Sequence, residues 1–331
     1  MFDPLVKQPL LTKIVVVLLV GCGVNQLFSN VLSYNDKSDL SQNALFEHAS
    51  LKKKESNKTD TKIRFAAYNV LFGLWAKPES IGEMFNPYDL DVICFNEVPN
   101  GDWTARVGRV LGMDYVHLGK VSSANHKDKY KSILCRFPLR DKGEIIINAK
   151  GWKPASLVSA KTNIKGVPLM LYSTHIPGQP EVQKSAAVYI AENVIRGSMH
   201  DNLIILGDLN NQLDKGALKS IKTVGMKSIW KELAIDTAKI STHKHIETGN
   251  ETGVIDHIFF RSRTYAVEVT NGGIIDSAYN SPEEEIQMTR YKTEWLKYGK
   301  PLSDHRPIWA EFFFESRLIS KSDAELKAEG K

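Results

Sequence analysis

The stretch PLSDHRPIWAEFFF, residues 301–314, contains the last apolar run of the chain and opens with an acid beside an imidazole. Alone, it has an ordinary explanation. Ser303 and Asp304 would form a turn, His305 would be a surface histidine, and Pro307 would begin a β-strand. Whether Asp304 and His305 have a function therefore depends on what the other apolar runs of the chain carry at their ends.

Short β-rich runs recur from Ile63 onward, and most of them end in polar residues. These runs are IRFAAYNV (63–70), DVICFNEV (91–98), KSILCRFPL (131–139), EIIINA (144–149), VPLMLYSTHI (167–176), LIILGDL (203–209), VIDHIFF (254–260) and PIWAEFFF (307–314). Between two of them, residues 180–196 carry an apolar stripe at helical spacing. Strands with interspersed helices and no repeat predict an α/β (α+β) sandwich, with sheets in the middle and helices outside.

Composition agrees with a folded enzyme or binding protein. The 331 residues are 42% hydrophobic and 24% charged, which is enough to bury a large core. The formal net charge is +5, but residues 51–62 alone hold five lysines against two acids. The remainder is nearly neutral, so global charge gives little reason to expect tight nonspecific binding of nucleic acid.

The N-terminus has the pattern of an export signal. The apolar run 14–20 follows two lysines, has the length of a signal h-region and is too short to span a bilayer. Residues 19–22, Leu-Val-Gly-Cys, resemble a bacterial lipobox, in which cleavage leaves Cys22 to carry lipid. An ordinary signal peptide or a short uncleaved anchor is the alternative. We therefore predict an exported protein, periplasmic or at the cell surface, and a membrane-anchored lipoprotein if Cys22 is lipidated.

Four segments follow from these patterns. We predict a signal sequence over 1–22, a flexible polar and basic linker over 23–61, one catalytic domain over 62–317 and a polar tail over 318–331. Cys94 and Cys135 lie in apolar runs, which predicts buried free thiols. No protein partner is inferred, and a monomer is expected.

Carboxylates, amides and imidazoles gather at the ends of the apolar runs. Each has an ordinary role as a turn or cap residue, but such a set builds an active site if the strand ends converge. The set is Asn69, Glu97, His175, Asp208, Asn210, Asp256, His257, Asp304 and His305. Carboxylate and amide oxygens without cysteine suit Mg²⁺, and also Mn²⁺ or Ca²⁺, better than zinc. A divalent ion beside a histidine oriented by a carboxylate indicates hydrolysis of a phosphate ester.

The order of these residues resembles the endonuclease/exonuclease/phosphatase superfamily, which has the deoxyribonuclease I fold. That superfamily includes AP endonucleases, bacterial sphingomyelinases and inositol-polyphosphate phosphatases. The resemblance covers about residues 62–315 and rests on Asn69-Val70, Asn96-Glu97-Val98, Ser132 to Pro138, Thr174-His175, Gly207 to Asn210, Ile255 to Ile258 and Ser303 to Pro307. It implies a four-layered sandwich, in which two central, mostly antiparallel β-sheets are flanked by helices.

The resemblance also implies roles at the metal. Glu97 and Asn69 would bind or position the divalent cation, and Asp304 would be a further ligand. Asn69 would also contact the substrate.

The remaining roles concern the phosphate and the water. Asp208 and Asn210 would hold the scissile phosphate and the attacking water, and His305, paired with Asp256, would be the general base. His175 would stabilise charge on the phosphate or protonate the leaving oxygen. The Thr174-His175 pair is absent from the AP-endonuclease branch, so a DNA-repair role is disfavoured.

Two positions depart from the family pattern. The family commonly has Gln before the glutamate, where this chain has Asn96, and often Gly where it has Lys131-Ser132. Tyr130 and Lys131 face the substrate phosphate or are an exposed strand start; the sequence leaves both open.

Substrate choice stays open at this level. An exported nuclease is favoured by the aromatic and basic segment 276–300 and by the mildly basic loop 120–130. A phosphatase or a sphingomyelinase/phospholipase-C-like phosphodiesterase acting on lipid or sugar phosphates is favoured by membrane anchoring. A catalytically inactive binding module is the remote alternative, because every expected catalytic position is occupied.

Overall fold

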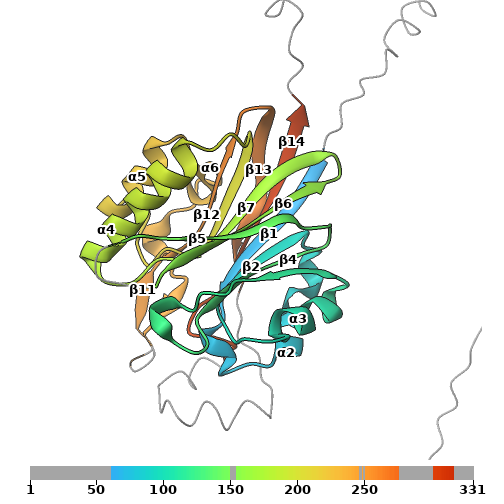
Figure 1. Cartoon of the computed structure of the whole chain (residues 1–331), viewed down its shortest axis with the longest axis vertical. Coiled ribbons are helices and arrows are strands. Elements are labelled where there is room, and N and C mark those ends of the chain that lie inside the picture. Colours follow the sequence, from blue (N-terminus) through green and yellow to red (C-terminus); the bar gives the residue numbers. More distant parts are fainter. Residues whose placement is uncertain (1–60, 150–153, 246–247, 249, 276–300, 317–331) are drawn as a thin grey trace, which may run out of the picture. The chain divides into compact units, whose positions relative to one another are not determined.

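The computed structural model describes residues 61–149, 154–245, 248, 250–275 and 301–316. Most of these residues form two six-stranded sheets and the helices around them (Figure 1). The predicted leader with Cys22, the linker up to residue 60, the segment 276–300 and the tail 318–331 lie outside the described residues. In the part of the chain that is described, no helix is long and apolar enough to cross a membrane.

The first sheet has the strand order β13-β14-β1-β2-β4-β3. Only β1 and β2 are parallel within it; the other neighbours are antiparallel. The strands are β13 (Tyr265–Ile274), β14 (Ile308–Ser316), β1 (Thr61–Asn69), β2 (Val92–Val98), β4 (Tyr130–Cys135) and β3 (Tyr115–Leu118).

The second sheet repeats this arrangement, with the order β5-β6-β7-β8-β12-β9 and one parallel pair, β7 and β8. Its strands are β5 (Arg140–Ile146), β6 (Ser156–Ile164), β7 (Val167–His175), β8 (Asn202–Asp208), β12 (Asp256–Ser262) and β9 (Lys227–Ser228). A separate hairpin pairs β10 (His243–Lys244) with β11 (Glu251–Gly253). The prediction of two mostly antiparallel sheets is confirmed.

Helices cover the outer sides of the strands, and Figure 1 shows α2 and α3 on one side and α4, α5 and α6 on the other. They are α2 (Pro78–Phe85), α3 (Trp103–Leu111), α4 (Pro180–Tyr189), α5 (Lys219–Thr223) and α6 (Ile229–Glu232). Single 3₁₀ turns occupy Leu71–Gly73, Asn86–Tyr88, Ser123–Asn125, Gly216–Leu218 and Thr237–Lys239. A π-helical turn, Ile190–Arg196, extends α4, so the predicted helix over 180–196 is confirmed.

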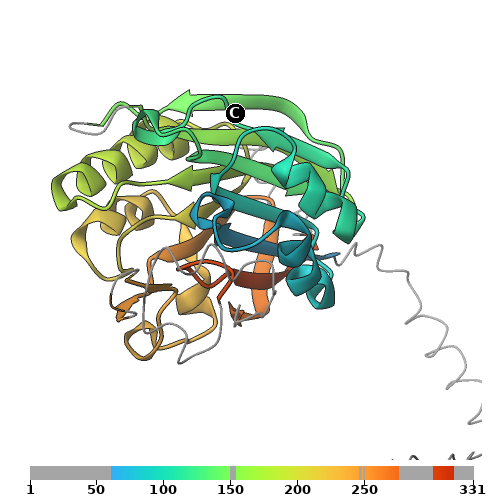
Figure 2. The ribbon, with the colours of Figure 1, turned by 90° about the horizontal axis from the view of Figure 1, so that it is seen from below.

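The alternation of side chains along β1 produces the layers. Phe65 lies in the large core that the two sheets share, together with Leu171 of β7. Tyr68, on the other face of β1, lies in a second core with Phe85 of α2 and Val107 of α3. Because successive strand residues point to opposite faces, a strand buried on both faces must be covered twice. Figure 2 shows the blue strands of the first sheet and the green strands of the second as separate layers, and the predicted sandwich is confirmed.

All eight apolar runs coincide with strands of these sheets. The sequence did not indicate β3, β6, β9 or β13. In β6 and β13, polar residues are interspersed among the hydrophobic ones, as in VSAKTNI and VEVTNGG, so neither strand forms an apolar run. Cys94 and Cys135 are buried and free, as predicted.

Candidate active site

The parallel strand pairs bring the predicted residues together. β1 and β2 are aligned with Asn69 opposite Asn96, and β7 and β8 with His175 opposite Asp208. Asp256, at the start of antiparallel β12, pairs with Asp208 as well. The side-chain amide of Asn69 donates a hydrogen bond of 3.0 Å to Asp208, which connects the two sheets at this edge. The convergence that the sequence could not show is therefore present.

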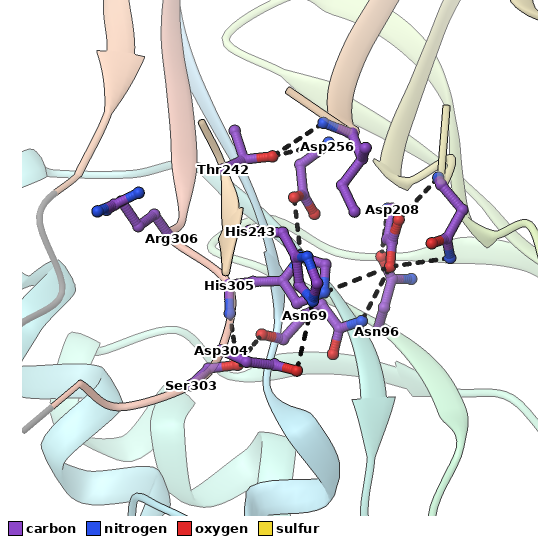
Figure 3. Close-up of polar contacts among 12 residues, drawn as sticks. Asn69, Asn96, Asp208, Thr242, His243, Asp256, Ser303, Asp304, His305 and Arg306 are labelled. Carbon is purple, nitrogen blue, oxygen red and sulfur yellow. Dashed lines mark hydrogen bonds and ion pairs between the residues drawn. The ribbon is translucent and has the colours of Figure 1, made fainter. Parts of the chain in front are cut away.

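These ends surround a cavity of about 360 Å³. Predicted site residues and others line it: Asn69, Leu71, Phe72, Glu97, Lys129, His175, Pro177, Gly178, Gln179, Asp208, Asn210, His243, Asp304 and His305. Asp256 is fully buried behind His305 (Figure 3). His257 is buried too, but its Nε2 bonds the carbonyl oxygen of Asn211, which gives it a structural role.

His305 is held between two carboxylates. Its Nδ1 donates a hydrogen bond of 2.9 Å to Oδ2 of Asp256, and its Nε2 lies 3.6 Å from Oδ2 of Asp208 (Figure 3). Burial alone would lower the pKa of His305, but the charges of Asp256 and Asp208 raise it to about 10. A divalent cation beside these acids would offset their charge and lower the pKa of His305, as a general base at neutral pH requires.

Asp208 is at the centre of the polar contacts. Its backbone N–H donates to Oδ1 of Asn96 at 2.8 Å, and its Oδ1 accepts from the backbone N–H of Asn210 at 2.8 Å. Burial and the charge of Asp256 raise the pKa of Asp208 to about 7, against the opposing charge of His305. Asn96, the departure from the family pattern, therefore acts through its amide oxygen, because it fixes the end of β8.

Glu97 and His175 form the opposite end of the contact network from Asp256. Nδ1 of His175 lies 3.8 Å from Glu97, whose carboxylate also pairs with Nζ of Lys129 at 3.4 Å. Burial holds the pKa of His175 well below its usual value, and the charge of Lys129 adds to this. His175 is thus neutral at neutral pH, and it can offer a hydrogen bond to a phosphate but no positive charge. Burial and the charge of Asp304 raise the pKa of Glu97.

Among the predicted site residues, Glu97 and Asn210 have left-handed backbone conformations, with φ of 52° and 48°. Glu97 is also the extra residue of a bulge, because the pairing of β2 with β4 shifts between Asn96 and Val98. A bulge redirects the side chain it carries, and such local strain is frequent at functional sites. The bulge is what turns Glu97 into the cavity although its strand neighbours are buried in the sheet.

The donor set fits a hard divalent cation. Three buried carboxylates, those of Glu97, Asp208 and Asp304, line the same cavity with the amide of Asn69. Concentrated negative charge of this kind is costly in a buried cavity unless a cation compensates it. The ligand roles of Glu97, Asn69 and Asp304 stay predictions.

Tyr130 and Lys131 do not lie where a substrate phosphate in the cavity would contact them. Within the described residues, neither belongs to the lining of the cavity. Lys131 is fully buried, and its ammonium group donates to Oγ of Ser123 at 3.0 Å. The preceding loop folds back over β4 through a backbone bond from Ser123 to the carbonyl oxygen of Lys129, and this covers Lys131. Lys131 is also not an exposed strand start, which was the other interpretation that the sequence allowed.

Among the cavity-lining residues that the sequence did not single out, Phe72, Lys129 and His243 have aromatic or basic side chains. The ring of Phe72 stacks on His126 at 4.7 Å, and Nζ of Lys129 lies 4.9 Å from the centre of the Phe72 ring. Lys129 was inside the basic loop 120–130, one residue before the pair that was named. His243 lies in a two-residue strand whose sequence shows no pattern, so no signal could have found it.

Comparison with known proteins places the chain among phosphoesterases. The model of the endonuclease/exonuclease/phosphatase family matches residues 66–305. No curated protein matches the chain.

Similar solved structures share the fold at low identity. An endonuclease/exonuclease/phosphatase from Beutenbergia cavernae is 15% identical, with a TM-score of 0.57 over 76% of this chain and 72% of that one. A mannosyl-6-phosphatase from Bacteroides thetaiotaomicron is 19% identical, with a TM-score of 0.57 over 76% and 99%. D. rerio TDP2, solved with a single-strand DNA product, is 17% identical, with a TM-score of 0.56 over 76% and 99%.

Proposed function

The chain belongs to the endonuclease/exonuclease/phosphatase family, whose members are metal-dependent phosphoric ester hydrolases, and we propose that it is an exported nuclease. The observation that carries this proposal is the cavity itself. It holds a histidine–carboxylate pair, hydrogen-bond donors for phosphate oxygens and three carboxylates for a cation in one space of about 360 Å³.

The residues suit attack of water on a phosphodiester. Because Asp256 accepts the Nδ1 proton of His305, Nε2 of the neutral imidazole is directed to the cavity and can take a proton from water. Asp256 then stabilises the imidazolium that forms. A divalent cation, when bound by Glu97, Asn69 and Asp304, polarises a phosphoryl oxygen and supports the leaving group.

His175 can hold the phosphate, and Asn210 positions His175. The amide nitrogen of Asn210 donates to the carbonyl oxygen of Ile176 at 2.8 Å and lies 3.1 Å from Nε2 of His175. The protons of the amide are thus engaged, and the neutral imidazole, protonated on Nδ1, can donate a hydrogen bond to a phosphoryl oxygen, whose charge rises in the transition state.

Nucleic acid is the substrate class that the mouth of the cavity suits best. The stacked rings of Phe72 and His126 offer an aromatic surface beside the ammonium group of Lys129. Bases stack on aromatic side chains, and a neighbouring lysine can pair with the next phosphate of the strand. In the similar TDP2 structure the bound product is single-strand DNA.

A sugar or lipid phosphate is the second candidate. A volume of about 360 Å³ lies within the range of pockets for small ligands. The similar structure of a mannosyl-6-phosphatase is consistent with such a substrate. A lipid phosphate substrate would also suit an exported, lipid-anchored protein. Export and lipid anchoring are predicted from the leader sequence and from Cys22.

A substrate panel tests the proposal. Chelator-treated protein supplemented with Mg²⁺ or Mn²⁺ would be incubated with plasmid DNA, RNA, sphingomyelin and small phosphomonoesters, with His305→Ala as the control. Cleavage of DNA or RNA, weakened steeply by added salt, supports the nuclease. Hydrolysis of sphingomyelin or phosphomonoesters alone would establish the second candidate instead.

A further inference from the structure

The loop between β3 and β4, residues 119–129, is fastened to the second sheet by one carboxylate. Glu144 of β5 accepts hydrogen bonds from the backbone N–H groups of Lys120 at 2.6 Å and Val121 at 3.2 Å. The hydroxyl of Ser156, on the neighbouring strand β6, donates to the same carboxylate at 2.6 Å and holds it in place. Hydrogen bonds to a charged acceptor are stronger than those between neutral groups. A loop of the first sheet thus depends on an acid of the second.

Gly119 allows the loop to approach this carboxylate. A Cβ at Gly119 would lie 2.8 Å from Oε1 of Glu144 and 2.6 Å from Cγ2 of Val158. A larger residue would push the start of the loop away from β5 and β6. The contact is therefore part of the fold and not a chance meeting of exposed groups.

A buried ammonium group provides a second anchor. Lys131 of β4 and Ser123 of the loop are fully buried, and Nζ of Lys131 donates to Oγ of Ser123 at 3.0 Å. Burial lowers the pKa of Lys131 to about 8, and the charge of Glu144 opposes this. Glu144 therefore compensates the buried charge besides binding the loop. Lys131, which departs from the family pattern, serves the loop and not the substrate.

The anchored part of the loop is connected to the part that reaches the cavity. Oγ of Ser122 accepts from the backbone N–H of Lys129 at 3.0 Å, and the N–H of Ser123 donates to the carbonyl oxygen of Lys129 at 3.1 Å. The carbonyl oxygen of Ser123 accepts from the N–H of His126, also at 3.1 Å. Displacement of the anchored residues would therefore displace His126 and Lys129, which contact the ring of Phe72 at the mouth of the cavity.

The backbone of the loop does not favour this shape by itself. Ala124 and Asn125 both have left-handed conformations, with φ of 54° and 58°. Side chains with a Cβ adopt this region at a cost in free energy, and it persists only where the surroundings impose it. The two anchors supply that constraint.

We propose that Glu144 is a positioning residue that sets the affinity for nucleic acid, because it holds His126 and Lys129 at the mouth of the cavity. Glu144 is not part of the lining of the cavity that the described residues form, so it acts through the loop and not on the reacting phosphate. The inference rests on the proposed function, since it takes a nucleic-acid strand as the ligand of these two side chains.

Steady-state kinetics of Glu144→Ala in the full chain test this. KM for an oligonucleotide is expected to rise about 5–10-fold, because stacking and phosphate contacts are displaced, while kcat for bis(p-nitrophenyl) phosphate stays within about twofold of wild type. Loss of an acid would by its charge alone strengthen binding of nucleic acid, so a rise in KM reports the position of the loop. Glu144→Gln keeps one acceptor oxygen and should recover part of the affinity. Asp141→Asn, at an exposed acid of β5 that pairs with Lys161, is the matched control and should not raise KM.

Limited digestion with trypsin, without substrate, measures the loop itself. Cleavage after Lys127 and Lys129 is expected to be at least about tenfold faster in Glu144→Ala than in wild type or Asp141→Asn, because the loop opens more readily. Ser122→Ala is a second, milder variant, since Ser122 is only partly buried, and it should also raise KM for the oligonucleotide. Thermal unfolding of each variant verifies that it is folded.

An unchanged KM for the oligonucleotide in folded Glu144→Ala would overturn the proposal, even if trypsin cleaved the loop faster, because the loop would then not contact the strand. An equal fall in kcat on both substrates at unchanged KM would overturn it too, since Glu144 would then support the reaction itself. If wild type cleaves no oligonucleotide, the proposed function fails. The digestion then decides the anchor alone: faster cleavage in Glu144→Ala supports it and unchanged cleavage contradicts it.

Discussion

Nδ1 of His305 donates a 2.9 Å hydrogen bond to Asp256, although the two residues are 49 positions apart. Asp256 begins β12 of the second sheet, and His305 lies three residues before β14 of the first. Both side chains are buried, and Asp256 is fixed in turn because the Thr242 hydroxyl accepts from its backbone N–H at 3.2 Å. The pair therefore keeps Nε2 of His305 directed at the cavity. A proton acceptor held this way needs no rearrangement when the substrate binds.

Asp256→Asn is expected to lower kcat about 10²–10⁴-fold with little change in KM. The amide keeps the shape but cannot stabilise the imidazolium, so the barrier to proton transfer rises. Initial rates with saturating metal and substrate measure this. Asp114→Asn, at an exposed aspartate, is the matched control; equal rates in both variants would remove Asp256 from the reaction.

Gly207→Ala is expected to destabilise the fold by about 2–4 kcal/mol and to lower activity. Gly207 has a φ of 143°, and an added Cβ would lie 2.0 Å from the carbonyl oxygen of Thr174 and 2.7 Å from Oδ1 of Asn96. The clash and the strained backbone both act against the native state. Denaturant unfolding measures the loss, with Gly197→Ala as the control, since a Cβ there has no neighbour within 4 Å. Equal stability of the two variants would contradict the packing described.

The buried Lys131 should make stability depend on pH. Burial lowers its pKa from 10.5 to about 8, so between these values the unfolded chain binds more protons than the native one. Unfolding free energy then rises with pH across this window, by up to roughly 3 kcal/mol from this group. In Lys131→Met this contribution is absent. The unfolding free energy of the variant relative to that of wild type should therefore fall between pH 7.5 and pH 10.

Denaturant unfolding at the two pH values measures that difference. Lys127→Met, at an exposed lysine of the same loop, controls for the loss of one charge and should differ from wild type equally at both. A wild-type to Lys131→Met difference that does not change with pH would show that Lys131 is not buried in solution.

Phe72→Ala is expected to raise KM for an oligonucleotide about tenfold or more and to leave hydrolysis of a small phosphomonoester unchanged. The reason is that stacking of a base on an aromatic ring contributes about 1–3 kcal/mol, and a substrate without a base cannot use it. Leu74→Ala, at a partly buried neighbour in the same turn, is the control for disturbance of the loop. An equal KM increase for both substrates would argue against a nucleic-acid surface at Phe72.

The sequence alone identified the sandwich and half of the cavity lining, because strand ends carry their functional residues in a fixed order. Glu97 and Asp208 were found for this reason. Phe72 and Lys129 were missed because they lie in loops, beyond the end of β1 and before the start of β4. The fold of these loops depends on tertiary contacts that a local sequence pattern does not show. Lys131 was named for its charge, but Ser123 and the loop bury it. His243 required the pairing of β10 with His305, which no local pattern encodes.

The most direct test of the account is metal-dependent hydrolysis of bis(p-nitrophenyl) phosphate by wild type, His305→Ala and Glu97→Ala. We expect turnover by wild type that a chelator abolishes and that Mg²⁺ or Mn²⁺ restores, and a loss of at least about 10²-fold in each folded variant. Near wild-type turnover in either variant would contradict the assignment of the cavity as a metal-dependent phosphoesterase site.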